Sequence, residues 1–181
     1  MQCFSDKVLI ERFAKHLLES PINVTGYSSK EEVIAKLIEP SLFLEKIIKK
    51  RNSEILDGGT GGGIPGIILA IKMKKSKFVL IDSRKKKIDY LNEFIADNSI
   101  DNCLGIHGRV EKLKGMFDAG TARGLASPEK TLDLFKKRIN KNGRLYIQTS
   151  PSMEYPDHRA GFILKDTING EVVNNLIYEK E

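Results

Sequence analysis

The feature that most constrains the fold of this chain is a glycine-rich segment at residues 54–71. Five glycines fall among the six residues from Gly58 to Gly63, directly after an apolar stretch that ends in Asp57. Pro65 follows, ahead of apolar residues that suit a helix. Glycine tolerates positive φ and lets a ligand approach the backbone, and proline fits the first turn of a helix. The segment therefore predicts a strand, a tight turn and a helix whose free N–H groups face a nucleotide-type ligand.

The spacing of this segment fits two classes of nucleotide cofactor. Gly61, Gly63 and Gly66 match the pattern G-x-G-x-x-G, and Asp82 ends the next apolar strand. A carboxylate at that point can accept hydrogen bonds from both hydroxyls of a ribose. Dinucleotide-binding folds and S-adenosylmethionine (SAM) methyltransferases share this arrangement. A P-loop is excluded, because no Gly-Lys-Ser or Gly-Lys-Thr follows the glycines.

Residues 1–53 are predicted to form a short helical N-terminal portion. Leu9, Phe13 and Leu17 recur at helical spacing, Ser29 begins a capping box, and Pro40-Ser41 is expected to start a third helix. The segment Lys49-Lys50-Arg51-Asn52 is expected to end this portion. We expect it to belong to the same single domain, 1–181, as the core that follows.

Residues 54–181 alternate between strand and helix patterns, which is typical of a parallel sheet with crossover helices. Ser83 is expected to cap one helix, and another is expected to begin at Ser127 and to end at Asn142-Gly143, with Ile139 facing inward. The later strands are predicted at 104–107, 117–122 and 144–149. Residues 162–168 and 172–178, around Asn169-Gly170, predict a closing β-hairpin. The fold class is therefore α/β, and the hairpin favours a Rossmann-like methyltransferase sheet over a plain dinucleotide fold.

Composition narrows the function classes. The chain has 181 residues, too few for a cofactor domain plus a separate substrate domain. Its net charge is +6, and residues 54–150 carry 18 Lys and Arg against 11 Asp and Glu, which favours a polyanionic partner. Cys3 and Cys103 are too few for a disulfide framework or a metal site, so no metal is expected. Without a signal peptide or an apolar run of membrane-spanning length, we expect a cytoplasmic protein with no membrane partner, and a monomer.

Further candidate residues follow the predicted strands, because ligands of open α/β sheets lie beyond the carboxyl ends of the strands. Val110, between Arg109 and Glu111, could contact an adenine, and Arg123 could hold a methionyl carboxylate or an RNA phosphate. The histidines suggest no catalytic triad, so no catalytic residue is assigned. Guanine N7 carries a free lone pair at neutral pH and needs no base, which is consistent with that absence.

Four segments together resemble the RsmG (GidB) methyltransferases, in order and spacing, over about residues 22–150. They are Ile55 to Gly66, Leu80 to Ser83 with Lys86-Lys87, Arg109-Val110-Glu111, and Phe117-Asp118 with Thr121 to Ser127. The resemblance implies a bacterial enzyme that uses SAM to methylate N7 of a guanosine in 16S ribosomal RNA. It also implies SAM contacts at Gly59, Ile64, Val110, Glu111 and Arg123. Two segments depart from the family pattern: Lys36 to Ser41 lacks its His and Asp, and Gln148 stands where a lysine is expected.

The complete hypothesis is a SAM-dependent methyltransferase whose partner is ribosomal RNA or the small ribosomal subunit. Its expected cofactor-binding residues are Asp57, Gly59, Thr60, Gly61, Ile64, Asp82, Val110, Glu111 and Arg123. Its expected RNA contacts are Arg109, Lys85 and Lys86, within the wider basic runs Lys72 to Lys77 and Arg84 to Lys87. One alternative is a catalytically impaired RNA-binding member of the same fold. Another is an NAD-dependent oxidoreductase, which the absence of a Tyr-x-x-x-Lys pair disfavours.

Overall fold

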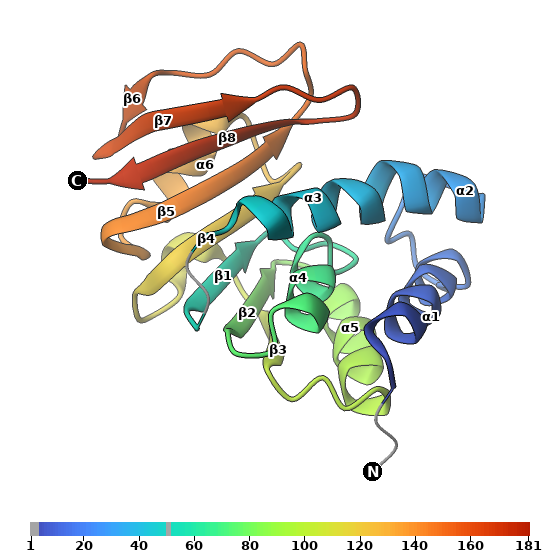
Figure 1. Cartoon of the computed structure of the whole chain (residues 1–181). Helices are drawn as coiled ribbons and strands as arrows, with labels where there is room; N and C mark the ends of the chain where they lie inside the picture. Colours follow the sequence, from blue (N-terminus) through green and yellow to red (C-terminus); the bar gives the residue numbers. More distant parts are fainter. Residues whose placement is uncertain (1–3, 50–51) are drawn as a thin grey trace.

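The computed structural model describes residues 4–49 and 52–181 (Figure 1). Its helices are α1 (Asp6–Leu18), α2 (Lys30–Val33), the π-helical turn η1 (Ile34–Ile38), α3 (Glu39–Ile47), α4 (Gly66–Lys72), α5 (Lys85–Asp97), the 3-10 turn η2 (Val110–Lys112) and α6 (Pro128–Phe135). Its strands are β1 (Glu54–Gly58), β2 (Lys77–Asp82), β3 (Cys103–His107), β4 (Phe117–Arg123), β5 (Ile139–Thr149), β6 (His158–Arg159), β7 (Phe162–Ile168) and β8 (Asn174–Lys180). None of these helices has the length and apolar content needed to cross a bilayer.

All the strands of the described residues form one sheet in the order β3-β2-β1-β4-β5-β8-β7-β6. Strands β1 to β5 run parallel to one another, and β8 lies antiparallel between β5 and β7 (Figure 1). The expected α/β class and the closing hairpin are thus confirmed. Because β1 pairs with both β2 and β4, their carboxyl ends meet at one edge of the sheet. That edge carries the glycine-rich turn.

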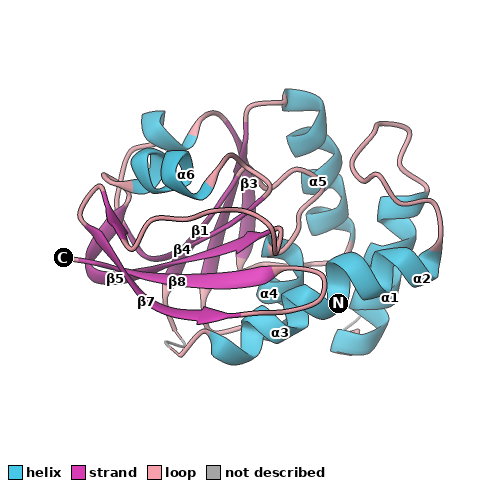
Figure 2. Ribbon diagram, turned by 90° about the horizontal axis from the view of Figure 1, so that it is seen from above, coloured by secondary structure: helices cyan, strands magenta, loops and turns pink. Residues whose placement is uncertain are grey.

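The two faces of the sheet bury different cores, because successive side chains of a strand point to opposite faces. Ile55 packs in a cluster with residues of α1, α3, α4 and α5, whereas Leu56 packs in a second cluster with residues of α6. Figure 2 shows α6 on one side of the sheet and α3 and α4 on the other. Every strand through the middle of the sheet is therefore buried on both faces, as expected for parallel strands.

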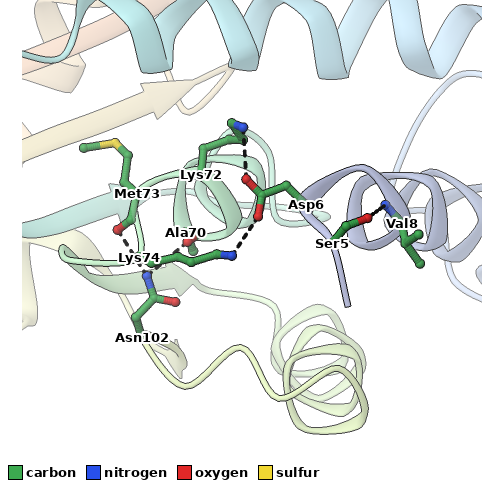
Figure 3. A network of polar contacts seen from close by, with 8 residues as sticks. All are labelled: Ser5, Asp6, Val8, Ala70, Lys72, Met73, Lys74 and Asn102. Carbon is green, nitrogen blue, oxygen red and sulfur yellow. Dashed lines mark hydrogen bonds and ion pairs between the residues drawn. The ribbon is translucent and has the colours of Figure 1, made fainter. Parts of the chain in front are cut away.

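Helix α1 is held against α4 by apolar and ionic contacts. Phe13 is fully buried among the helices of the first cluster. Asp6 lies between Lys72 and Lys74, at 3.0 and 2.8 Å (Figure 3). The hydrogen bond from Lys74, together with Lys72, holds the pKa of the Asp6 carboxyl below its ordinary value although partial burial opposes this. The same figure shows Asn102 donating to the carbonyls of Ala70 and Met73 beside this contact.

The expected third helix is present as α3, with Pro40 in its first turn, but it does not begin separately at Pro40-Ser41. The capping box at Ser29 is present, but the helix it starts continues through the π-helical turn η1 into α3. Pro40 lacks the N–H that an α-helix would direct at the carbonyl of Lys36, and Arg123 donates to that carbonyl instead. The Ser41 hydroxyl donates to the carbonyl of Leu37 at 2.7 Å. Contacts made by later residues thus allow the helix to pass through the proline.

The expected end of the last helix is also wrong. Helix α6 stops at Phe135, and Ile139 is a buried residue of β5 that pairs with Phe117. Asn142-Gly143 interrupts the pairing inside β5 instead of ending a helix: Asn142 has φ 61°, and a Cβ on Gly143 would lie 2.7 Å from the carbonyl oxygen of Asp118. Pairing with β4 therefore outweighs the helical spacing of Ile139 in the sequence.

Smaller differences lie at element ends. The N-cap of α5 is Arg84 and no side chain caps it, so the expected cap at Ser83 is absent. Strand β8 begins and ends two residues later than expected.

Cys3 and the Lys50-Arg51 pair lie outside the described residues, and Cys103 is a buried free thiol. No cluster of metal-ligating side chains occurs in residues 4–49 and 52–181.

The carboxylate of Asp57, at the end of β1, joins the three elements around the glycine-rich turn. Its Oδ2 accepts from the Thr60 hydroxyl at 2.6 Å and from the Gly66 backbone N–H at 3.2 Å. Its Oδ1 accepts from the Thr121 hydroxyl of β4 at 2.8 Å. Complete burial raises the pKa of Asp57 to about 6, although these three donors favour the charged form. The turn is therefore held from inside the protein.

Replacing Gly66 by Ala should destabilise the fold by roughly 1–3 kcal/mol, as overpacking a core does. The new Cβ would lie 2.3 Å from the buried Leu80 side chain and 2.7 Å from Asp57 Oδ2. Chemical denaturation followed by circular dichroism measures the change. Gly26→Ala is the matched control, because no heavy atom lies within 4 Å of its Cβ. Equal stability of the two variants would contradict this close packing.

Asp57→Asn should change how stability depends on pH. The carboxyl pKa is about 6 in the folded protein against an ordinary value of 3.8, so the folded state binds this proton more tightly than the unfolded chain. Its contribution to stability is complete below the ordinary pKa and is lost as the pH rises through about 6. Relative to Asp57→Asn, the wild type should lose about 3 kcal/mol of unfolding free energy over that range. Urea titrations at a series of pH values measure this difference, and a difference independent of pH would refute it.

Candidate functional site

The glycine-rich turn crosses the carboxyl ends of β1 and β2. The backbone N–H groups of Gly59 and Thr60 donate to the Ile81 carbonyl at 2.8 and 3.0 Å. The N–H of Gly61 donates to Asp82 Oδ2 at 2.9 Å. Gly59 and Gly61 both have positive φ, 67° and 58°, a conformation that side chains with a Cβ rarely adopt. The glycines thus bring the turn onto the end of β2, beside the predicted ribose acceptor.

A cavity of about 490 Å³ opens beside this turn. Its volume falls within the range of small-molecule sites, about 300–1,000 Å³. The structure brings together five of the residues predicted from sequence in its lining: Gly59, Asp82, Arg109, Val110 and Glu111. Val110 is buried, whereas Arg109 and Glu111 are exposed. A smaller cavity of about 310 Å³ lies elsewhere, between Phe4 and Asn102, and holds none of the predicted site residues.

The cavity also has lining residues that sequence reasoning missed. Leu125 follows β4, and Lys130 and Leu134 come from α6. A Cβ on Gly59 would lie 2.5 Å from the Leu125 side chain, so this leucine covers the glycine turn. Leu125 lies inside the segment Thr121 to Ser127 that carries the family resemblance, but Arg123 was the only residue of that segment expected to bind the ligand. Lys130 and Leu134 lie on an ordinary amphipathic helix, and no sequence signal marked them.

Asp82 is nearly buried, with 5% of its side chain exposed. It accepts hydrogen bonds from Gly61, from the Arg84 backbone N–H at 2.9 Å and from Arg84 Nε at 3.2 Å. Burial favours the neutral acid, but these donors and the Arg84 charge hold the pKa of Asp82 below its ordinary value. The cavity therefore contains a charged carboxylate, which suits a ligand with hydroxyl or amine donors.

Arg123 lies at the end of β4 but does not line the cavity. Its guanidinium donates to the carbonyl of Lys36, and its Nη1 is buried without a partner among the described residues. Burial lowers the pKa of this guanidinium. The unpartnered donor could bind an oxyanion, which is compatible with the role expected for Arg123.

Asp57, Thr60, Gly61 and Ile64 lie within or beneath the turn and do not line the cavity. Asp57 and Thr60 are buried and bonded to each other. In this structure they shape the turn.

The expected RNA contacts separate into two places. Lys85 and Lys86 are exposed at the start of α5, beside the cavity, and Lys85 pairs with Asp89 at 2.7 Å. The run Lys72 to Lys77 extends from the last residue of α4 to the first residue of β2 and lies at the opposite edge of the sheet, where Lys72 pairs with Asp6. The structure therefore does not bring this second run to the cavity.

Gln148 stands where the family pattern has a lysine, and it is buried. Its Nε2 donates to the Pro40 carbonyl and to Asn175 Oδ1, both at 2.9 Å. It pairs with Arg123 in the register of β4 and β5. Two neighbouring strand ends thus each bind a carbonyl of the helix that covers them.

Comparison with solved structures identifies the same fold in a methyltransferase and in a second protein bound to S-adenosylmethionine. A SAM-dependent methyltransferase from Aquifex aeolicus aligns with a TM-score of 0.66 and 18% identity, over 97% of this chain and 98% of that one. A mutant of MtNAS in complex with S-adenosylmethionine aligns with a TM-score of 0.65 and 17% identity, over 96% and 72% of the two chains. At these identities the likeness establishes the fold alone.

Comparison of sequences is more specific. The family described as rRNA small subunit methyltransferase G, GidB, matches residues 7–174. The protein named ribosomal RNA small subunit methyltransferase G from Chlorobaculum tepidum is 37% identical to this chain, over 77% of this chain and 65% of the relative. The protein of the same name from Francisella philomiragia is 33% identical, over 73% of this chain and 64% of the relative. The match from Mesoplasma florum is 31% identical over 97% of this chain and 78% of the relative. The chain thus spans just under two thirds of the first two relatives. On this evidence, and with the glycine turn, Asp82 and Val110 meeting at one cavity, the chain belongs to the rRNA small subunit methyltransferase G (GidB) family.

Proposed function

We propose that this chain is a SAM-dependent methyltransferase that methylates N7 of a guanosine in small-subunit ribosomal RNA, in the cytoplasm. The observation that carries the proposal is the cavity at the carboxyl edge of the sheet, where Gly59, Asp82 and Val110 meet in a chain of this family. The names of the relatives and the fold of the structural neighbours support it.

The residues at the cavity fit the chemical groups of SAM. The charged Asp82 would accept hydrogen bonds from the ribose hydroxyls, and the buried Val110, with Glu111, would contact the adenine. The unpartnered Arg123 Nη1 suits the methionyl carboxylate. Gly59, Gly61 and Ile64 would lie along the nucleoside, on a turn that Asp57 and Thr60 hold in place. SAM supplies an electrophilic methyl group on a sulfonium.

The protein's part in the reaction would be to orient the acceptor. Guanine N7 already presents a lone pair, so no residue of this chain is assigned to remove a proton. Orientation alone can contribute roughly 7–11 kcal/mol to lowering a barrier. The exposed side chains of Lys85, Lys86 and Arg109, beside the cavity, would bind RNA phosphates and give salt-sensitive binding.

Isothermal calorimetry should detect binding of SAM and of S-adenosylhomocysteine and none of NAD. Asp82→Asn should weaken SAM binding by roughly 10- to 100-fold, because hydrogen bonds to a charged group contribute about 1.5–3 kcal/mol. Asp89→Asn, an exposed carboxylate on α5, is the matched control and should leave SAM affinity unchanged. Preferential binding of NAD would overturn the cofactor assignment.

Methyl transfer should be measured with radiolabelled SAM on small ribosomal subunits and on purified small-subunit ribosomal RNA. We expect label at one guanosine, located by borohydride reduction and aniline cleavage, which break RNA at N7-methylguanosine. Label at another atom of the base would refute the acceptor. RNA binding and SAM binding without transfer would favour the catalytically impaired alternative.

A further inference from the structure

The carboxylate of Asp82 is fully occupied by donors from its own chain. Oδ1 accepts from the Arg84 backbone N–H at 2.9 Å and from Arg84 Nε at 3.2 Å. Oδ2 accepts from Gly61 N–H at 2.9 Å and from Arg84 Nη2 at 3.5 Å. Two ionised carboxylate oxygens offer about four lone-pair sites. Every site on the predicted ribose acceptor is therefore taken, two of them by the Arg84 side chain.

The Arg84 side chain is the group that can leave. The two backbone donors are fixed by the glycine turn and by the start of α5, whereas 62% of the Arg84 side chain is exposed. Its guanidinium can withdraw without unpacking the core. Asp82 and Arg84 both line the cavity, so a ribose that reaches Asp82 takes the place of this guanidinium.

The surroundings of Arg84 determine where a released guanidinium binds. It is followed directly by Lys85, Lys86 and Lys87, and Arg109 lines the same cavity. Lys85 pairs with Asp89, but within residues 4–49 and 52–181 no carboxylate pairs with Lys86 or Arg109. Glu111 is the other carboxylate that lines this cavity, and the proposed function assigns it to the adenine of the cofactor. Phosphate is its complementary partner, because the planar fork of arginine binds two phosphate oxygens at once.

We propose that Arg84 is shared between Asp82 and an RNA phosphate, so that the adenosine cofactor and RNA bind cooperatively. This inference rests on the proposed function and names a residue that links its two ligands. While it is paired with Asp82, Arg84 is withheld from RNA. When the ribose hydroxyls take Asp82, Arg84 becomes an additional phosphate contact. By linkage, RNA must then strengthen cofactor binding by the same factor as the cofactor strengthens RNA binding.

The experiment uses S-adenosylhomocysteine, which keeps the ribose and cannot transfer a methyl group, and purified small-subunit ribosomal RNA. In the wild type, calorimetry should give tighter S-adenosylhomocysteine binding with RNA present than without it. Arg84→Ala should bind S-adenosylhomocysteine about two- to five-fold more tightly than the wild type in the absence of RNA, as expected from removing an exposed ion pair. The effect of RNA on that affinity should be lost in the variant.

The salt dependence of RNA binding gives a second readout. For the wild type, loading with S-adenosylhomocysteine should steepen the plot of log affinity against log salt by about 0.7–0.9, the value for one added phosphate contact. For Arg84→Ala the slope should be the same with and without the cofactor. Arg84→Lys retains one cation without the fork, and it should keep the steepening while holding Asp82 less firmly.

Arg12→Ala is the matched control, because it removes the same side chain from α1, where the guanidinium lies 4.5 Å from the Phe4 ring. It should leave S-adenosylhomocysteine affinity unchanged. If the wild type binds S-adenosylhomocysteine and Arg84→Ala binds it no more tightly, or if RNA coupling survives in that variant, the sharing of Arg84 is refuted and the proposed function stands. If the wild type binds neither SAM nor S-adenosylhomocysteine, the proposed function itself fails.

Discussion

The buried carboxylate of Asp57 is the contact on which the geometry of the site depends. It ends β1 and accepts hydrogen bonds from the turn, from the first residue of α4 and from β4. Burying a charge is costly unless donors compensate it, and here three donors converge on two oxygens. Because each donor comes from a different element, the carboxylate fixes the path of the glycine turn between them. The N–H of Gly61 consequently points at Asp82 across the end of β2.

Residues close together in the sequence were sufficient to predict the glycine turn and the strands on either side of it. The glycines, the acids that end β1 and β2, and the alternation of strands and helices each depend on residues close together in the sequence. The same holds for the capping box at Ser29. The sequence did not predict which of the two acids would face the ligand and which would be buried inside the protein. Asp57 and Asp82 end adjacent strands, yet only Asp82 lines the cavity.

The errors share one cause, which is that distant residues decide the outcome. A proline followed by serine is a normal helix start, and the contact of the distant Arg123 with the Lys36 carbonyl shows why the helix passes through Pro40. Ile139 has helical spacing with Phe135, but its pairing with Phe117 places it in a strand. Leu125 was missed for the same reason, since its position over Gly59 depends on the path of the chain after β4. Spacing along a sequence contains none of these contacts.

Two segments that depart from the family pattern, Lys36 to Ser41 and the end of β5 at Gln148, are in contact with each other in the structure. Gln148, in place of a lysine, donates to the carbonyl of Pro40, which lies in the segment that lacks the family's His and Asp. One helical turn earlier, the carbonyl of Lys36 accepts from Arg123, the register partner of Gln148 in β4. The Nε2 of the neutral Gln148 amide is hydrogen bonded, while its Oε1 is buried without a partner among the described residues. A lysine buried here would need a charged partner. The changes therefore form one rearranged contact between the helix and the ends of β4 and β5. Asp57 and Asp82 lie on β1 and β2, and their hydrogen bonds do not involve it.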